Sequence, residues 1–202
     1  MANGTIKQLT TPEGLSALSD SLSDVSSYYN EPENLAAVKQ TVQSFIRDNP
    51  DLANVGLKIR PGIHGAYHPK DDYAITGVVN PAVVGHELGH AKNLRKARLY
   101  NKILQAARGV ANVNNVVALP AMLSLRAFVD DENTRNEVLN ILSGASAAVA
   151  APGLVEELSA SIEAMKHTPD KWQATKTLGP AFLQHAAHAL MPTALYQLGK
   201  HI

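Results

Sequence analysis

The sequence predicts a mainly helical protein with a small antiparallel β-sheet, an α+β fold. Aromatic residues make up only 5% of the 202 residues. Apolar residues recur at three- and four-residue steps along most of the chain, which is typical of amphipathic helices. Strand-like alternation is confined to residues 57–75, between Pro-Gly and polar turn signals. This length predicts a single domain, residues 1–202, that can bury its own core.

Two helices are expected within residues 1–50. Thr11-Pro12 opens the first, and its apolar residues are Leu15, Leu18, Leu22 and Val25. Glu31-Pro32-Glu33 begins the second, and Asn49-Pro50 ends it. The N-terminus has no apolar core of the signal-peptide type, so secretion by that route is not expected. We expect this helical pair to pack behind the rest of the domain.

Residues 55–108 are expected to hold the sheet and a helix that follows it. Leu57–Arg60 predicts a first strand, and residues 66–75 predict a hairpin whose polar turn is 69–72. Asn80-Pro81 then predicts a helix N-cap with proline at the first helical position. His64 and His68, before this helix, are interpreted as ordinary surface histidines.

Residues His86-Glu87-Leu88-Gly89-His90 fit the pattern H-E-x-x-H. On a helix, positions i and i+4 share one face, so both imidazoles can reach one metal ion. Glu87 is placed to hold a metal-bound water. The alternatives are a coincidental pair of surface histidines and a purely structural zinc site. Structural sites use four protein ligands, mostly cysteine, and this chain has no cysteine, so a catalytic Zn²⁺ site is the favoured interpretation.

Residues 109–155 predict an apolar helical hairpin. Two uncharged stretches, Gly109–Leu125 and Val138–Val155, flank the acidic turn Asp130-Asp131-Glu132. Each stretch is near the lower length limit for spanning a bilayer, and a basic flank before the first would place the metal site on the cytoplasmic side. A hairpin buried within a soluble domain or an assembly is the alternative, because asparagines such as Asn112 are costly in hydrocarbon.

Residues 156–202 should supply the third metal ligand and a C-terminal helix. Glu157 is the first candidate ligand, Glu156 the second and Glu163 the third. The small residues 159–161 would let this helix pack close to the H-E-x-x-H helix. Three residues of the C-terminal helix are candidate oxyanion donors, although a polar stripe on a core helix explains them too: His185, His188 and Tyr196.

With these residues in place, the chain resembles the gluzincin metallopeptidases, in which two histidines and a downstream glutamate bind zinc. It is most similar to the membrane-embedded HtpX and CAAX-prenyl-protease branch. There, His-Glu-Leu-Gly-His is followed by a hydrophobic hairpin and then a Glu-x-x-Ala-Asp helix. The likeness covers residues 57–165, and it implies a zincin-like core with the hairpin as an insertion. Ser161 stands where the family has aspartate, and Arg95 lies where it often has an acidic residue.

Together, the motif and the resemblance imply a zinc metalloendopeptidase. Glu87 would be the general base that activates water at the metal, and a peptide substrate would lie along the edge strand near Tyr67 or Tyr73. The alternative function is a structural or membrane-active component of a virion or secretion complex, with an inactive or structural zinc site. Nucleic acid is not an expected partner, because the net charge is zero and the basic run 92–108 lacks interleaved aromatic residues.

Overall fold

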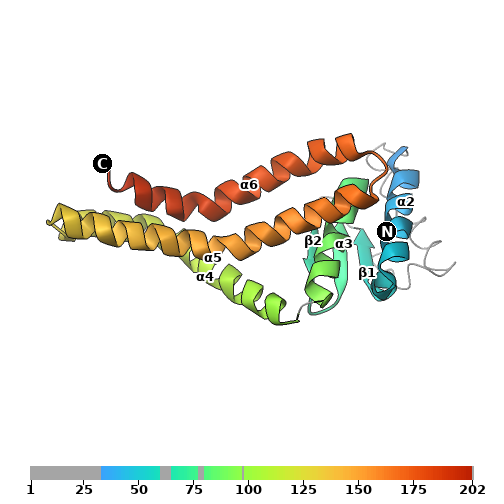
Figure 1. The fold of residues 1–202 in the computed structure, drawn as a ribbon, viewed down its shortest axis with the longest axis horizontal. Coiled ribbons are helices and arrows are strands. Elements are labelled where there is room, and N and C mark those ends of the chain that lie inside the picture. The colour runs from blue at the N-terminus through green and yellow to red at the C-terminus, as the bar shows by residue number, and fades with distance from the viewer. Residues whose placement is uncertain (1–32, 60–64, 77–79, 97, 202) are drawn as a thin grey trace. The chain divides into compact units, whose positions relative to one another are not determined.

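The computed structural model describes residues 33–59, 65–76, 80–96 and 98–201 (Figure 1). The helix expected at residues 11–25 lies outside these ranges. The chain divides into two compact units, which are described separately. Unit 1 comprises Met1–Arg98 and Glu157–Pro180, and unit 2 comprises Leu99–Glu156 and Ala181–Ile202. Two long helices therefore each contribute one part to each unit.

The helices and strands of unit 1 follow the predicted order. They are α2 (Glu33–Asp48), the 3-10 helix η1 (Pro50–Asn54), β1 (Gly56–Ile59), β2 (Ala66–His68), β3 (Tyr73–Thr76) and α3 (Pro81–Lys96). The prediction of a helix ending at Asn49-Pro50 is confirmed. The Asn49 side-chain amide donates to the carbonyl of Phe45 at 3.1 Å, and Pro50 begins the 3-10 turn.

The sheet is mixed, with the strand order β1-β3-β2. The predicted hairpin is confirmed, because β2 and β3 pair antiparallel. The prediction of a wholly antiparallel sheet is wrong, because β1 pairs parallel with β3. Residues 60–72 separate these two strands, which is long enough for the crossover that a parallel pair requires. Asp72 closes the hairpin turn with a φ of 53°, a conformation that aspartate tolerates better than most residues.

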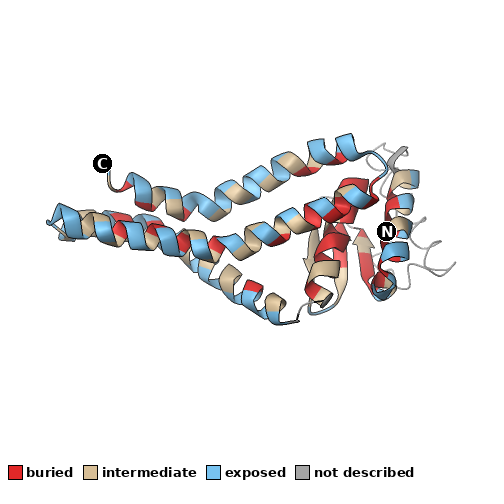
Figure 2. Ribbon diagram, in the orientation of Figure 1, coloured by how far each residue is buried: buried red, intermediate tan, exposed pale blue. Residues whose placement is uncertain are grey.

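One hydrophobic core joins the sheet to α2 and α3. The two helices contribute Val38, Val42, Phe45, Ile46, Val84, Leu88 and Ala91, and the sheet and η1 contribute Leu52, Val55, Leu57, Ile59 and Ala74. Within unit 1, the buried residues gather on α3 and on the faces that it meets (Figure 2). Because α3 is packed on two sides, the helix that carries the H-E-x-x-H motif is fixed in place.

Three long helices complete the chain. They are α4 (Arg98–Phe128), α5 (Glu132–His167) and α6 (Lys171–Leu198). The predicted hairpin is confirmed, since α4 and α5 are joined by a short turn in which the Asp131 carboxylate accepts the Thr134 amide at 2.7 Å. Asp170 caps α6 in the same way, accepting the Gln173 amide at 2.9 Å. Such caps satisfy amides that have no partner within the helix.

The predicted boundary between the hairpin at residues 109–155 and the third-ligand helix from residue 156 is wrong, because one helix runs through it. Helix α5 continues through Pro152 and Gly153 for 36 residues in all. A proline removes one backbone hydrogen bond, which a long helix packed against a neighbour can tolerate. In unit 2 the Tyr100 hydroxyl donates to the Pro152 carbonyl at 3.1 Å, so this position is also held from outside the helix.

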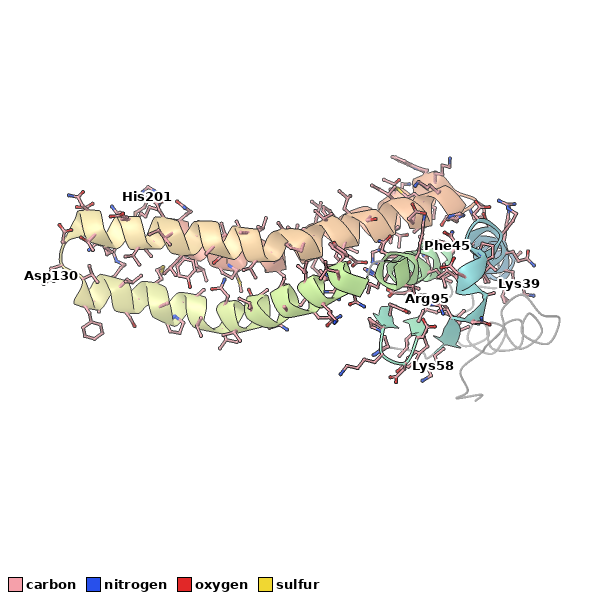
Figure 3. The ribbon with its side chains drawn as sticks, turned by 60° about the horizontal axis from the view of Figure 1, so that its bottom comes forward. Lys39, Phe45, Lys58, Arg95, Asp130 and His201 are labelled. Atoms are coloured by element: carbon pink, nitrogen blue, oxygen red, sulfur yellow. The ribbon has the colours of Figure 1, made fainter. Side chains whose placement is uncertain are left out.

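Unit 2 has a small core of its own. Ala118, Met122, Leu139 and Tyr196 are buried together, one or more from each of its three helices. Near the α4–α5 turn, Arg126 donates to the carbonyl of Gly199 at 2.9 Å. The C-terminal end of α6 therefore lies at the turn end of the hairpin, as the neighbouring labels Asp130 and His201 show (Figure 3).

Candidate metal centre

The helix that the H-E-x-x-H motif requires is present. The Asn80 carboxamide oxygen accepts the amides of Ala82 at 2.9 Å and Val83 at 3.4 Å, so the predicted N-cap is confirmed. His86 and His90 lie one turn apart on α3, and their Nε2 atoms are 2.9 Å apart. This separation is short enough for one metal ion to contact both nitrogens.

Glu157 meets the two histidines from α5. Its Oε2 atom lies 3.3 Å from Nε2 of His86 and 3.6 Å from Nε2 of His90. The ligand atoms of these three residues all lie within 4.8 Å of one another. Ligand atoms at about 2.0–2.1 Å from a tetrahedral zinc ion would stand about 3.3 Å apart. The three separations bracket this value, so the residues present fit a single metal ion.

The other two candidate third ligands are engaged elsewhere. In unit 2, Oε2 of Glu156 lies 3.4 Å from the Arg108 guanidinium. In unit 1, Glu163 accepts Lys92 at 2.5 Å and Lys166 at 2.6 Å. Adjacent residues on a helix point about 100° apart, so only one of Glu156 and Glu157 can face the histidines. Of the three, Glu157 is the one brought to His86 and His90.

Close packing between α3 and α5 brings Glu157 within reach. A Cβ on Gly89 would lie 2.7 Å from the carbonyl oxygen and 2.9 Å from the Cα of Ala160. One turn earlier, a Cβ on Gly85 would lie 3.2 Å from the Cα of Ala164. The prediction that small residues at 159–161 permit close packing is confirmed. The matching role of the two glycines was missed, although a glycine inside a helix is itself a signal of close approach.

Ser161 orients the first histidine. Its hydroxyl donates to the carbonyl of Glu157 at 2.9 Å and lies 3.2 Å from Nδ1 of His86. Because the hydroxyl proton points to the carbonyl, the oxygen can accept a hydrogen bond from Nδ1 of His86. That tautomer leaves Nε2 of His86 available to a metal ion. Ser161 stands where the gluzincin pattern has aspartate, and its contact with Nδ1 is of the kind that orients a metal-binding histidine.

The charge of Glu157 also suits a metal ligand. Burial acts to raise the pKa of its carboxyl, but the contacts with His86 and His90 outweigh burial and hold the pKa well below its ordinary value. The group is therefore a carboxylate at neutral pH. Two neutral imidazoles and one carboxylate form a common ligand set of catalytic zinc sites.

Glu87 lies beside this cluster and is 4% exposed. Its carboxylate lies against Gly65, which immediately precedes β2, and a Cβ at Gly65 would collide with it. The backbone before β2 thus limits where the Glu87 carboxylate can lie. Gly65 was missed in the sequence, because nothing local marks a contact with a residue 22 positions away.

Tyr67 and Tyr73 lie on the hairpin that precedes α3. The Tyr67 hydroxyl donates to Asp72 at 2.6 Å, and burial together with that carboxylate raises the pKa of Tyr67. Arg95 of α3 pairs with Asp72 at 2.5 Å and donates to the carbonyl of Asp51. Tyr73 stacks on His68, with ring centroids 4.7 Å apart. These contacts tie the hairpin to the helix of the metal centre.

The remaining sequence candidates belong to unit 2. His185 and His188 are exposed on α6, whereas Tyr196 is buried and its hydroxyl donates to Asn114 Oδ1 at 3.3 Å. The buried hydrogen bond gives Tyr196 a structural contact within the three-helix core. Oxyanion donation by any of the three stays a prediction.

The basic run between residues 92 and 108 serves internal contacts. Lys92, Arg95 and Arg108 each pair with a carboxylate from another segment of the same unit, namely Glu163, Asp72 and Glu156.

No family model matches the chain, and no curated protein or solved structure matches it either. The functional argument is therefore carried by the geometry of His86, His90 and Glu157, and the likeness to gluzincins stays a prediction.

Proposed function

We propose that the chain is a zinc-dependent peptidase with a zincin-like core, in which His86, His90 and Glu157 hold Zn²⁺. The observation that carries this proposal is the convergence of three ligand atoms from two helices at separations of 2.9, 3.3 and 3.6 Å. A set of three protein ligands leaves one position open, which is the arrangement of catalytic rather than structural zinc.

Bound at these residues, zinc would polarise the scissile carbonyl and lower the pKa of water enough for hydroxide to form near neutral pH. Glu87, next to His86 on α3, would accept the proton of the attacking water on its carboxylate. It would then return that proton to the leaving amine. Gly65 supports this role, because its bare backbone allows the Glu87 carboxylate to lie alongside it.

An extended peptide is the substrate that the surroundings favour. Strand β2 is at one end of the strand order, so among the described strands it has one neighbour, β3. A peptide could pair with the outer edge of β2 through main-chain hydrogen bonds. Arg95 and Tyr67 hold this hairpin through Asp72, which would keep the edge in a fixed position relative to α3.

Glu87→Gln tests the mechanism. The substitution preserves shape but removes the base, so hydrolysis of a fluorogenic peptide library should fall by about 10²- to 10⁴-fold while zinc content stays unchanged. Metal content by elemental analysis should show one zinc per chain, lost in Glu157→Ala and kept in the matched variant Glu156→Ala. Hydrolysis that survives Glu87→Gln would overturn the mechanism.

The same measurements distinguish the second candidate function from a peptidase. A structural or membrane-active component of a larger assembly would bind zinc through the same three residues yet hydrolyse no peptide. The large apolar side chains exposed on unit 2 favour keeping this candidate. Zinc at one ion per chain without any Glu87-dependent hydrolysis would select it.

A further inference from the structure

The side-chain polarity of unit 2 is inverted relative to a water-soluble helical bundle. Its three uncharged stretches are Gly109–Leu125, Val138–Val155 and Ala181–Leu198. Large apolar side chains on these stretches point outward: Val110, Val113, Val116, Val117, Leu119, Leu123, Ile141, Val155, Leu183, Leu190, Met191 and Leu198. Soluble monomers rarely expose large apolar patches, and where they do the patch marks an interaction site.

Polar side chains instead bond to one another between the helices. Asn114 of α4 donates to Ser146 of α5 at 2.8 Å and accepts the Tyr196 hydroxyl of α6 at 3.3 Å. Gln197 of α6 donates to Ser143 of α5 at 2.8 Å. Ser143 and Ser146 are both buried. Helices in lipid associate through small residues and interhelical hydrogen bonds of this kind, because apolar packing gains little there.

Charged residues of unit 2 lie only at the two ends of these stretches. At the end where α4 begins are Lys102, Arg108 and Glu156, and Arg108 pairs with Glu156 at 3.4 Å. At the turn end are Arg126, Asp130, Asp131, Glu132, Arg135, Glu137 and Lys200. At 1.5 Å per residue the uncharged stretches are about 25–27 Å long, close to the roughly 30 Å hydrocarbon core of a bilayer.

The exposed polar residues within the stretches lie near an end, with one exception. Within four residues of the end where α4 begins are Asn112, Gln184 and His185. Within one turn of the opposite end are Ser124, Asn140 and Gln197. His188 is the exception, because it lies close to the middle of the α6 stretch. The other exposed positions in the middle of the stretches are apolar or small, as expected where only the ends meet lipid headgroups.

We propose that unit 2 inserts into a lipid bilayer as a three-helix module, with its polar residues inside and its apolar faces against acyl chains. Helix α5 is the described helix that is long and apolar enough to cross by itself, and only 22% of its most apolar window is buried. Helices α4 and α6 join it through the polar contacts. A second copy of the chain would cover this apolar surface less well than lipid, because the exposed apolar residues lie on all three helices rather than on one face. This proposal does not depend on the peptidase.

Flotation of the full-length chain with vesicles of phosphatidylcholine and phosphatidylglycerol tests the proposal. The wild type should float with the vesicles and resist an alkaline carbonate wash. Val116→Lys places a charge at the middle of the α4 stretch and should lower the ratio of floated to unfloated protein at least ten-fold. Leu99→Lys is the matched control, since Leu99 is as exposed (72% against 75%) but lies outside the stretch, and it should change the ratio less than two-fold.

Three results would overturn the inference. The first is a wild type that stays in buffer without detergent as a monomer or a defined oligomer. The second is protein released by the carbonate wash, which would mean peripheral binding. The third is equal flotation of Val116→Lys and wild type. Zinc content, measured on the same protein in detergent, is a separate readout. The peptidase proposal requires one zinc per chain whether or not unit 2 inserts into lipid.

Discussion

Units 1 and 2 bury opposite kinds of residue. In unit 1, Phe45, Leu52 and Leu57 are fully buried, and the ionic pairs of Lys92 and Arg95 lie near the surface. In unit 2, serines and alanines such as Ser146 and Ala150 are inside, and most large aliphatic side chains are outside. The candidate metal ligands of unit 1 therefore lie beside a core of large aliphatic and aromatic side chains, whereas unit 2 leaves many large aliphatic side chains on its surface.

The two units also use glycine differently. On α3, a Cβ on Gly89 would collide with the backbone of Ala160, and a Cβ on Gly85 would lie in tight contact with Ala164. Gly109 and Gly144 of unit 2 have no atom within 4 Å of the position that a Cβ would take. A Cβ on Gly199 of unit 2 would meet the Met122 side chain at 2.6 Å, but not a helix backbone. Among the described glycines, close approach to another helix backbone is therefore found on α3, and substitutions matched across the units can test each part of this comparison.

The largest contrast is expected from leucine truncation. Leu52→Ala in unit 1 should lower the free energy of unfolding by about 2–5 kcal/mol, because truncation of a buried leucine leaves a cavity in the hydrophobic core. Leu139→Ala in unit 2 removes a side chain that is equally buried (0% exposed for both) and should cost less. Local unfolding energies from hydrogen exchange in detergent would measure both. Equal costs would mean that unit 2 is stabilised by burial from water.

Glycine substitution should give the next largest effect. Gly89→Ala should destabilise unit 1 by about 1–3 kcal/mol and weaken zinc binding, because the new methyl group meets the Ala160 backbone and pushes Glu157 away. Gly144→Ala is the control on α5 and should stabilise that helix by about 0.5–1 kcal/mol. Thermal unfolding and zinc titration would read out both. Unchanged zinc affinity in Gly89→Ala would contradict the role given to close packing.

A smaller effect is expected from the polar contacts of unit 2. Asn114→Leu removes the bonds to Ser146 and Tyr196 and should cost about 0.6–1.7 kcal/mol, the range for hydrogen bonds between helices in lipid. Asn112→Leu, an exposed neighbour, should stay within about 0.5 kcal/mol of wild type. Unfolding in mixed micelles would compare them. A gain in stability for Asn114→Leu would show that the network does not hold the helices together.

The smallest effect is expected for the pH dependence of the unfolding free energy of unit 1. His167 packs on Phe45 with ring centroids 4.2 Å apart, and its Nδ1 lies 3.1 Å from the Ser44 hydroxyl. Burial lowers the pKa of His167, opposed by the nearby Asp48 and Glu163 carboxylates. The unfolded chain then binds this proton more readily than the folded chain, so stability should fall as the pH drops below about 6.5.

His167→Gln should flatten the dependence of the unfolding free energy on pH between about 7 and 5. The Glu163 carboxyl affects the unfolding free energy in a lower pH range. Burial tends to raise its pKa, but Lys166 and Lys92 outweigh burial and lower it, so its stabilisation is lost only below its ordinary value of 4.5. An identical slope in His167→Gln would show that this histidine is not the titrating group.

Much of the candidate metal site was predictable because it depends on local geometry. Asn80-Pro81 predicts where α3 begins, and an α-helix then places His86 and His90 on one face whatever surrounds it. The helices of the hairpin and the β2–β3 turn were predictable for the same reason. Each depends on the spacing of apolar residues or on turn residues a few positions apart.

Tertiary structure decided what depends on residues far apart in sequence. The parallel pairing of β1 with β3, the close contact of Gly89 with Ala160 and the position of Gly65 beside Glu87 have no local signal. The continuity of α5 through Pro152 and the addition of α6 to the helical hairpin were missed for the same reason. The pairing of His86 with His90 and the apolar pattern of the helices follow from local sequence. Packing decided that Glu157, rather than Glu156 or Glu163, meets those histidines, because the helix rotation that selects it follows from contacts between α3 and α5.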